Sequence, residues 1–491
     1  MRRATAAVLV LLVCSSLTSQ APRDAYDDSL VLAPLYVGYT TDSEAEFAAQ
    51  VRELKANIGA AQGVLLGFAS FLHMTYPPKP MIETLDLIVA RARAGRIVTH
   101  VSVVSGFFHD ANDLRAEAVK QDVRNAQWFS DGWIAEPSVL KDSSSIPAGV
   151  WITPSRYAKP LRSRMEEGAR ALGSHIAGLM AKDPGTLVSV SGDAEVEFSY
   201  ERNIEAGERR IANAASVYAD YSPFMVEEFR DWLRGTRYSG DLNPGTDDNR
   251  DGRTFNRDYN QNFTTWKLRY YDASGPIPFS TYLALREKLP ADGAYFITGG
   301  FDAPRQEMSG DPLWEAWTRF RKQVIANYVR DFATWITTSP DPVSQRTVPA
   351  TRFYSHQIPA DFLFGDNNSV RLKTSASFAD TAVITPVGST GVTVFNTFDG
   401  KSHKKTGTDA LFRQLSVNNW GIFEYNPSVP IRAAAEPSAD VEYYLSELNN
   451  LKKFHPHIIV PFAWTNHPEL KSYRIQGRAF EKALKQFVGR N

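Results

Sequence analysis

Asn419-Trp-Gly-Ile-Phe-Glu-Tyr-Asn-Pro-Ser428 joins a short apolar run to one carboxylate, Glu424, just before a proline. A second stretch, Leu187-Val-Ser-Val-Ser-Gly-Asp-Ala-Glu-Val-Glu197, has the same form and ends in three carboxylates. A short apolar run bounded by turn residues is typical of a buried strand. We therefore predict two buried strands, about two hundred residues apart, with charged side chains at their carboxyl ends.

Working outward, strand-like and helix-like patterns alternate along the whole chain. The strand-like apolar runs are Leu32–Tyr39, Gly63–Phe71, Ile97–Val104, Leu187–Ser191, Thr351–His356, Gly391–Asn396, Trp420–Glu424 and Ile458–Trp464. The amphipathic stretches between them are Ser43–Asn57, Met81–Ala94, Leu161–Ala181, Pro223–Arg234, Trp314–Ile336, Val441–Lys453 and Ala479–Val488. Eight strands alternating with helices predict an α/β fold, a closed (β/α)8 TIM barrel.

The spacing between the predicted strands is uneven. Long insertions follow the third and fourth strands, over about residues 106–160 and 198–312. Residues 22–491 then form a single barrel with inserted loops. Because strand-to-helix connections lie at the active-site face of such barrels, we expect the insertions to build the walls of a deep cleft.

Composition excludes some classes of partner. The formal net charge is −1, so no basic excess indicates binding to nucleic acid or to an anionic membrane. Aromatic residues make up 12% of the chain, which suits a carbohydrate binder, although most aromatic side chains in any protein fill its core.

The N-terminus resembles a secretory signal peptide over residues 1–21. Arg2 and Arg3 supply the charged region, the apolar run Ala6–Val13 follows, and Ser19-Gln-Ala21 is a small-residue cleavage site. The apolar run is too short to span a bilayer. We expect an exported protein, periplasmic or extracellular, with a signal peptide of bacterial type.

Cys14 is the single cysteine, and it lies inside that signal. Acylation of Cys14 would make the chain a lipoprotein, but the bulky Val13 precedes it where a small residue is expected. Cleavage after Ala21 removes Cys14, so disulfides and cysteine-bound metals are not expected in the mature chain.

The carboxylates at the two strand ends predict the chemistry. In a barrel of this type the strand ends converge on one face, and a pair of carboxylates there performs glycoside hydrolysis. We assign Glu424 as the nucleophile; an arginine-paired structural carboxylate is the alternative. The acid/base is Glu195, with Glu197 as the fallback. Asp193 and Glu197 would raise the pKa of Glu195 through like charge.

Other residues near strand ends are candidate contacts of a sugar substrate. They are Asp193, Tyr354, His356, Gln357, Trp464 and His100, with Ser105, Trp128 and Trp133 as weaker candidates. His356 and Gln357 could bond sugar hydroxyls, Tyr354 could bond the nucleophile, and Trp464 could form the floor under the sugar ring. A place in the core is the alternative for each of them.

These residues carry a resemblance to the clan A glycoside hydrolases, most closely to the GH42 β-galactosidase-like group. Glu424-Tyr-Asn-Pro-Ser428 resembles that group's motif after strand seven, Tyr221–Leu233 resembles the helix after strand four, and Val460-Pro-Phe-Ala-Trp464 resembles strand eight with its platform tryptophan. The clan has asparagine before the acid/base glutamate, whereas this chain has Ala194. The resemblance implies that the sugar 2-hydroxyl is bound by another group, for which Asp193 is the candidate.

The segment 247–258 carries a separate signal. It reads Asp-x-Asn-x-Asp-Gly, and Asp247, Asn249, Asp251 and Asp258 present oxygens at a spacing that could hold calcium around the turn at Gly252. An ordinary Asp- and Gly-rich surface turn is the alternative.

Together these features predict a retaining glycosidase that acts on an oligo- or polysaccharide, with no membrane span and no cofactor required for catalysis. The rival interpretation is a catalytically silent carbohydrate-binding barrel, in which Ala194 marks lost chemistry. Sugar, linkage, endo or exo action and oligomeric state are not predicted.

Overall fold

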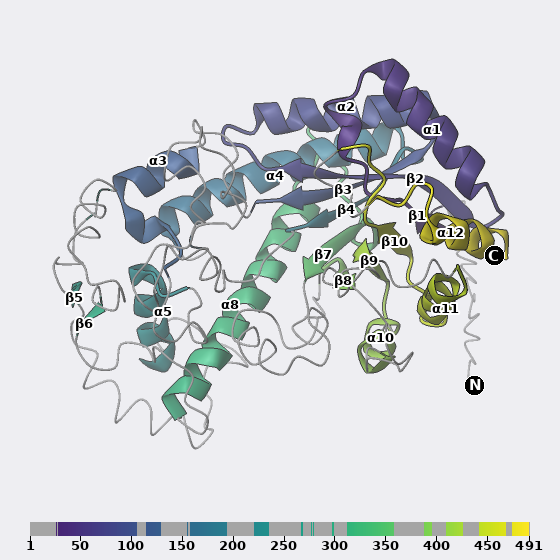
Figure 1. Ribbon diagram of the computed structural model, residues 1–491. Helices are drawn as coiled ribbons and strands as arrows, with labels where there is room; N and C mark the ends of the chain where they lie inside the picture. Colours follow the sequence, from purple (N-terminus) through teal and green to yellow (C-terminus); the bar gives the residue numbers. More distant parts are fainter. Residues whose placement is uncertain are drawn as a thin grey trace, which may run out of the picture.

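The computed structural model describes residues 26, 28–105, 114–128, 155, 158–193, 220–234, 267–268, 276, 278, 297–298, 312–357, 387–394, 409–425, 441–467 and 474–490 (Figure 1). The structural statements below concern these residues. Glu195 and Glu197, the calcium candidates Asp247, Asn249, Asp251 and Asp258, and the signal segment 1–21 lie outside them.

Eight parallel strands close into a barrel in the order β1-β10-β9-β8-β7-β4-β3-β2 (Figure 1). Their bounds are β1 Leu30–Leu32, β2 Val64–His73, β3 Val98–Val104, β4 Leu187–Gly192, β7 Phe353–Gln357, β8 Ser389–Val394, β9 Trp420–Tyr425 and β10 Ile458–Pro461. Seven of them overlap the predicted apolar runs over most of their length, whereas β1 shares only Leu32 with the predicted run Leu32–Tyr39. The predicted (β/α)8 barrel is therefore confirmed.

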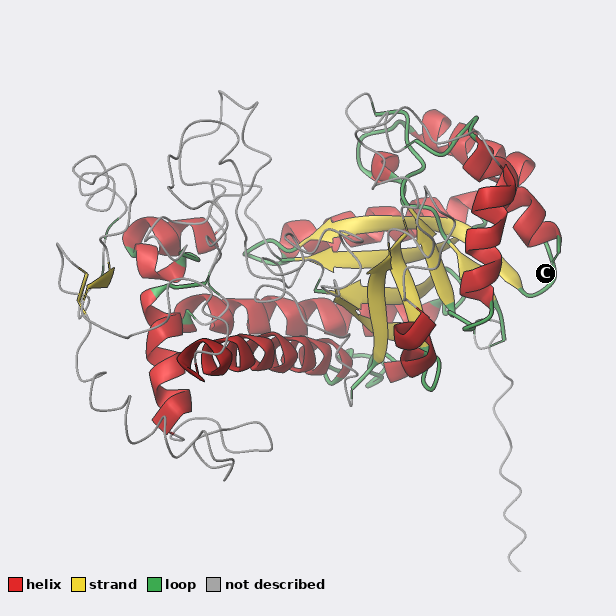
Figure 2. Cartoon of the chain, turned by 60° about the horizontal axis from the view of Figure 1, so that its bottom comes forward, coloured by secondary structure: helices red, strands yellow, loops and turns green. Residues whose placement is uncertain are grey.

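Helices surround the barrel (Figure 2). They are α1 Glu44–Ile58, α2 Lys79–Gly95, α3 Leu114–Gln121, α4 Lys159–Lys182, α5 Pro223–Arg234, α8 Pro312–Thr337, α10 Asp409–Leu415, α11 Val441–Lys452 and α12 Ala479–Gly489. The sequence pattern missed α3 and α10 because helices of eight and seven residues show too few turns for a helical period. Short 3-10 turns occur at Val37–Tyr39 (η1), Val123–Asn125 (η2) and Ala350–Arg352 (η7).

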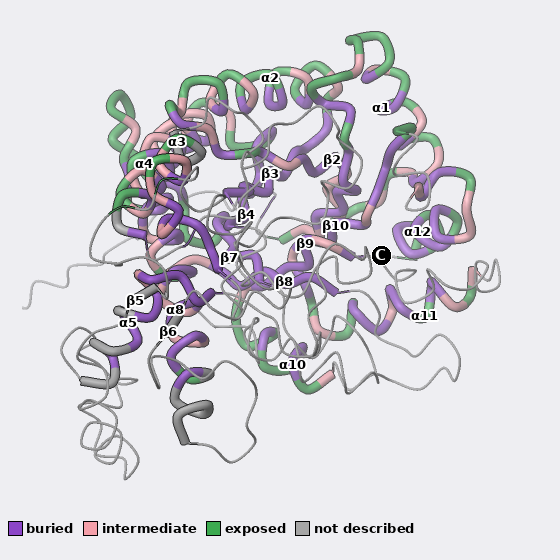
Figure 3. The backbone as a smooth tube through the Cα atoms, turned by 60° about the vertical axis from the view of Figure 1, so that its left-hand side comes forward, coloured by how far each residue is buried: buried purple, intermediate pink, exposed green. Residues whose placement is uncertain are grey.

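Two hydrophobic clusters fill the molecule, because successive side chains of a strand point to opposite faces. Leu32 and Ile459 pack in the layer between strands and helices. Their neighbours Val31 and Val460 fill the inside of the barrel. The strands are buried, whereas the outer faces of α1 and α2 are exposed (Figure 3).

The connections after β3 and β4 carry structure beyond the barrel. Two long helices, α4 and α8, pack so closely that a Cβ at Gly173 would lie 2.4 Å from the Ile336 carbonyl oxygen. The first half of α8 extends past the barrel toward α5 (Figure 1), where Trp317 packs edge-on against Phe229 of α5. A small antiparallel pair, β5 (Lys267–Leu268) and β6 (Ile297–Thr298), also lies in the second connection.

Candidate active site

Glu424 reaches the mouth of the barrel through an irregularity in β9. Along β8, Val392 pairs with Ile422 but the next residue, Thr393, pairs with Glu424, so β9 carries one extra residue. Pairing with β10 shows the same shift between Ile459 and Pro461. Two residues on a bulged strand face one residue of the partner, and such bulges re-aim side chains.

The bulge turns two successive side chains of β9 inward. Phe423 lies in the interior cluster. Glu424 pairs with Thr393, whose hydroxyl also points inward, and it is partly exposed to solvent at the end of the strand. Tyr425 points outward, and its hydroxyl donates to Glu447 of α11 at 3.3 Å. Without the extra residue, strict alternation would place Glu424 on the outer face beside Ile422.

A similar bulge occurs in β4, the strand that leads to the predicted acid/base. Thr99 of β3 pairs with Leu187 and His100 pairs with Ser189, so Val188 is the extra residue. Val188 packs in the interior cluster, and Ser189 also faces inward because it bonds His100. Both strands that carry the predicted carboxylates are therefore irregular, which the sequence pattern did not indicate.

Asp193 follows β4 and is fully buried. Its carboxylate accepts hydrogen bonds from the Ser105 backbone N–H at 2.7 Å, the Ser105 hydroxyl, and the Tyr328 hydroxyl at 2.8 Å. Tyr328 belongs to α8, so the Asp193 carboxylate links that helix by hydrogen bonds to the carboxyl ends of β3 and β4. A sugar hydroxyl would have to compete with these three donors, so the described contacts favour a structural role for Asp193 over the expected substrate contact.

A chain of hydrogen bonds crosses the barrel below Glu424. We call it the interior polar chain; its members are Ser189, His100, Ser191, Ser102, His356 and Thr393. The His100 ring lies 2.9 Å from the Ser189 hydroxyl through Nδ1 and 3.0 Å from the Ser191 hydroxyl through Nε2. Ser191 in turn donates to Ser102 at 2.9 Å.

His356 continues the interior polar chain to the neighbour of Glu424. Its Nδ1 lies 3.4 Å from the Ser102 hydroxyl, and its Nε2 lies 2.9 Å from the Thr393 hydroxyl. Ser191 gives its single proton to Ser102, so His100 Nε2 must donate to Ser191. Ser102 keeps its own proton for His356 Nδ1 in the tautomer that carries Nε2–H, and in that tautomer Nε2–H donates to Thr393.

Both imidazoles of this chain are neutral at neutral pH. Burial lowers the pKa of His356 to about 4. Burial, and secondarily the nearby His356, lower the pKa of His100 well below the ordinary histidine value. A neutral imidazole has one donor and one acceptor, so each histidine can donate to one neighbouring hydroxyl and accept from the other.

These contacts change the role expected for three polar residues. His100, His356 and Gln357 are buried, with His100 and Gln357 at 0% exposure. Both ring nitrogens of each histidine are engaged with protein hydroxyls, and the Gln357 amide donates to Ser355 at 2.9 Å. His100 and His356 lie inside the barrel below Glu424, where their ring nitrogens bond protein hydroxyls in place of the expected sugar contact. Gln357 pairs with Val392 and lies with Ser355 on the outer face of β7, so it does not face the interior.

Tyr354 lies at the opposite end of the barrel from Glu424. Its hydroxyl is 2.7 Å from the Tyr26 hydroxyl and accepts from the Asn419 side-chain amide at 3.1 Å. Asn419 precedes β9, whereas Glu424 lies near its carboxyl end, so Tyr354 does not make the expected bond to Glu424. It helps Tyr26 close the amino-terminal end of the barrel.

Trp464 is also placed differently from the expectation. Its ring is fully buried in the layer between strands and helices, where it packs against Phe68 and donates to Gln50 of α1 at 2.9 Å. It therefore cannot form the floor under a sugar. Two partly exposed aromatic residues pack against the interior cluster, Phe71 of β2 and Phe462, and Phe462 lies two positions after the inward-facing Val460. Counting in twos from Val460 would have identified it.

The weaker aromatic candidates are only partly described. Trp128 is fully buried, and its indole donates to the Val123 carbonyl at 2.8 Å, so it does not line a cleft. Trp133 lies outside the described residues. Within the described ranges, no cluster of three or more His, Cys, Asp or Glu residues could hold a metal ion. No described helix is both long and apolar enough to cross a membrane.

Comparison with solved structures finds a similar fold in a beta-amylase domain. The catalytic domain of the beta-amylase from Paenibacillus polymyxa aligns with a TM-score of 0.52 and 12% identity, covering 94% of this chain and 99% of that one. A GH5_18 structure from Streptomyces cattleya in complex with GlcNAc aligns with a TM-score of 0.38 and 11% identity, covering 94% of this chain and 80% of that one. A GH5-4 broad specificity endoglucanase from an uncultured bacterium has a TM-score of 0.35 and 9% identity, covering 94% and 95%.

No protein-family model matches the chain, and no curated protein matches its sequence. The likeness to the beta-amylase domain therefore concerns the fold. Barrels of this type host many chemistries, so the function has to be argued from the site.

Proposed function

We propose that this chain is an exported retaining glycoside hydrolase that cleaves a β-glycosidic bond. Glu424 is the nucleophile and Glu195 the acid/base, with Glu197 as the fallback. The observation that carries the proposal is the bulge in β9, which turns Glu424 from the outer face to the mouth of the barrel.

The surroundings of Glu424 suit a nucleophile. The residue is partly exposed and so can meet a substrate, while the interior polar chain below it is buried and fully bonded. The His356–Thr393 bond holds the residue that pairs with Glu424 across the sheet. A reactive group on a rigid strand, supported from below, is held in a fixed geometry.

The reaction would proceed by double displacement. A Glu424 oxygen attacks the anomeric carbon, while the Glu195 carboxyl gives its proton to the departing glycosidic oxygen. The covalent glycosyl-enzyme then reacts with water, which loses a proton to Glu195 and displaces Glu424 from the sugar. This requires the two carboxyls to lie about 5–5.5 Å apart.

The shared fold with a beta-amylase domain is compatible with an enzyme that acts on sugars. The GH42-like β-galactosidase activity and the export by the segment 1–21 rest on the sequence motifs alone. Phe462, and not Trp464, would supply the aromatic face for the sugar ring.

A catalytically silent carbohydrate-binding barrel is the competing proposal, and Ala194 favours it. Asparagine at this position in clan A enzymes holds the sugar, so its absence would leave a site that binds without turnover. The two proposals differ in one measurement, the release of a fluorescent alcohol from aryl glycosides.

The experiment is a screen of aryl β-glycosides that differ in the sugar, using the wild-type chain and Glu424→Gln. We expect one or more sugars to be cleaved, and Glu424→Gln to lower kcat by roughly four orders of magnitude without unfolding the protein. Glu83→Gln, on the exposed side of α2, is the matched control and should keep wild-type rates. No turnover by the wild-type chain on any sugar would favour the silent barrel.

A second variant tests the acid/base. Glu195→Ala should slow substrates with poor leaving groups far more than activated aryl glycosides, which need little protonation. Equal losses on both kinds of substrate would remove Glu195 from this role, and the same comparison on Glu197→Ala would then decide the fallback.

A further inference from the structure

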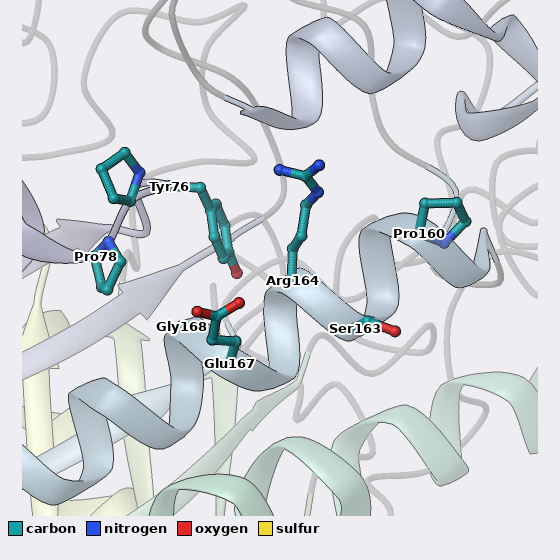
Figure 4. Close-up of a pocket in the computed structure, with 8 residues that line it drawn as sticks. Tyr76, Pro78, Pro160, Ser163, Arg164, Glu167 and Gly168 are labelled. Carbon is teal, nitrogen blue, oxygen red and sulfur yellow. The ribbon is translucent and has the colours of Figure 1, made fainter.

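A hollow of about 530 Å³ lies between the connection from β2 to α2 and the first turns of α4 (Figure 4). Its lining residues are Tyr76, Pro77, Pro78, Pro160, Ser163, Arg164, Glu167 and Gly168. Its volume is within the range of pockets that bind small molecules or single units of a polymer.

The hollow opens on the same face of the barrel as Glu424. Residues 74–78 follow the carboxyl end of β2, and α4 begins at the face where β3 ends. In a (β/α)8 barrel both connections belong to the face that carries the active site. A saccharide chain would have to extend from Glu424 across this face to reach the hollow.

The wall of the hollow is preorganised. The Tyr76 ring rests directly on the backbone of α4, because a Cβ at Gly168 would lie 2.7 Å from its Cε1. The prolines at 77, 78 and 160 supply apolar surface with almost no side-chain freedom to lose on binding, and the Tyr76 ring, only 5% exposed, forms the base of the hollow. Such surfaces pack well against the C–H faces of a ring.

The charged residues of the hollow are the unpaired ones on this part of α4. Arg162 pairs with Asp331, and Glu166 pairs with Arg170 at 2.9 Å. Arg164 and Glu167 also lie within reach of one another on the helix, yet neither makes a hydrogen bond or ion pair among the described residues. Figure 4 shows both side chains beside the Tyr76 ring.

The chemistry of this pair restricts the ligand. An anion would meet the Glu167 carboxylate, and a cation would meet the Arg164 guanidinium, so neither is favoured. A neutral polyol can accept hydrogen bonds from arginine and donate them to glutamate, while its C–H face packs on the prolines. We infer that the hollow binds one sugar unit of a saccharide chain, remote from the bond that is cleaved.

This inference rests on the proposed function, and its test separates the two. Binding is measured in Glu424→Gln, so that no substrate is consumed, by retardation in native gels containing mixed-linkage β-glucan, xylan, galactomannan or β-galactan. We expect at least one polysaccharide to retard the protein, and Arg164→Ala/Glu167→Ala to weaken that binding about ten-fold.

The control variant is Glu166→Ala/Arg170→Ala, which removes the neighbouring ion pair outside the hollow and should bind as strongly as the parent. In the active chain, the Arg164/Glu167 double variant should lower the ratio of kcat/KM on the retarding polysaccharide to kcat/KM on the aryl glycoside about ten-fold. Melting temperatures show whether each variant is folded.

Equal retardation of the two double variants, or no retardation by any polysaccharide while aryl glycosides are cleaved, would overturn the sugar-binding hollow. Retardation that depends on Arg164 and Glu167 in a chain without hydrolytic activity would support the hollow and contradict the proposed hydrolase.

Discussion

Acidification should destabilise this protein through His356. This histidine is 2% exposed, and burial lowers its pKa to about 4. In the unfolded chain its pKa returns to the ordinary value of about 6.5. Between these two values the unfolded state binds a proton that the folded state does not. The stabilisation from a neutral His356 is thus complete above pH 6.5 and is lost as the pH falls toward 4.

The size of the effect follows from the two pKa values. The gap between about 4 and 6.5 corresponds to about 3 kcal/mol of unfolding free energy at neutral pH. His100 acts in the same direction, because its pKa is also lowered by burial. A loss of this size is a large fraction of the stability of an ordinary domain.

The assay is urea unfolding of the wild-type chain and of His356→Gln at several values between pH 7 and pH 4. Glutamine does not titrate, and its amide can still donate to Thr393 in place of Nε2–H. The variant should be less stable at pH 7, but its disadvantage should shrink by about 3 kcal/mol by pH 4.

The control is His175→Gln, which replaces a partly exposed histidine paired with Asp86 on the surface of α4. It should follow the wild-type pH dependence more closely than His356→Gln does. If the wild-type chain and His356→Gln lose stability in parallel over this range, the buried neutral histidine does not contribute as argued.

Two further predictions concern the barrel interior and the acidic loop. A Cβ at Gly391 would lie 2.3 Å from the Phe423 ring. Gly391→Ala and Phe423→Leu should therefore each lower the free energy of unfolding by about 1–3 kcal/mol, and the double variant should lower it by less than the sum of the two. A double-mutant cycle in urea measures this, and additive losses would contradict the contact. We also propose that the segment 247–258 binds calcium. A chelator should then lower the melting temperature, and Asp251→Ala should remove this sensitivity. Identical melting with and without calcium would contradict calcium binding and leave the segment a surface turn.

The barrel itself could be predicted from the sequence because its signal is local. Apolar runs of strand length and amphipathic stretches of helix length alternate, and each residue contributes to its own element. The predicted helix Pro223–Arg234 has the bounds of α5, and the predicted run Trp420–Glu424 differs from β9 by one residue. The position of Glu424 at a strand end belongs to the same local information.

The sequence pattern could not identify hydrogen-bond partners that lie on other strands of the barrel. His100 and His356 each lie in a strand. Nothing near them in sequence shows that their ring nitrogens form hydrogen bonds with serines and a threonine of neighbouring strands. Trp464 follows a strand as a platform residue would. Its ring nevertheless packs under α1, where it contacts Phe68 and donates a hydrogen bond to the Gln50 side chain.

The direction of Glu424 was decided by the tertiary structure alone. Period-two alternation from Ile422 places Glu424 outward and Tyr425 inward, and the observed arrangement is the reverse. The extra residue in β9 exists only in relation to the registers of β8 and β10, to which it pairs. A bulge is a property of two paired strands, so residues 419–428 by themselves determine the strand and the carboxylate at its end, while the neighbouring strands determine which face that carboxylate occupies.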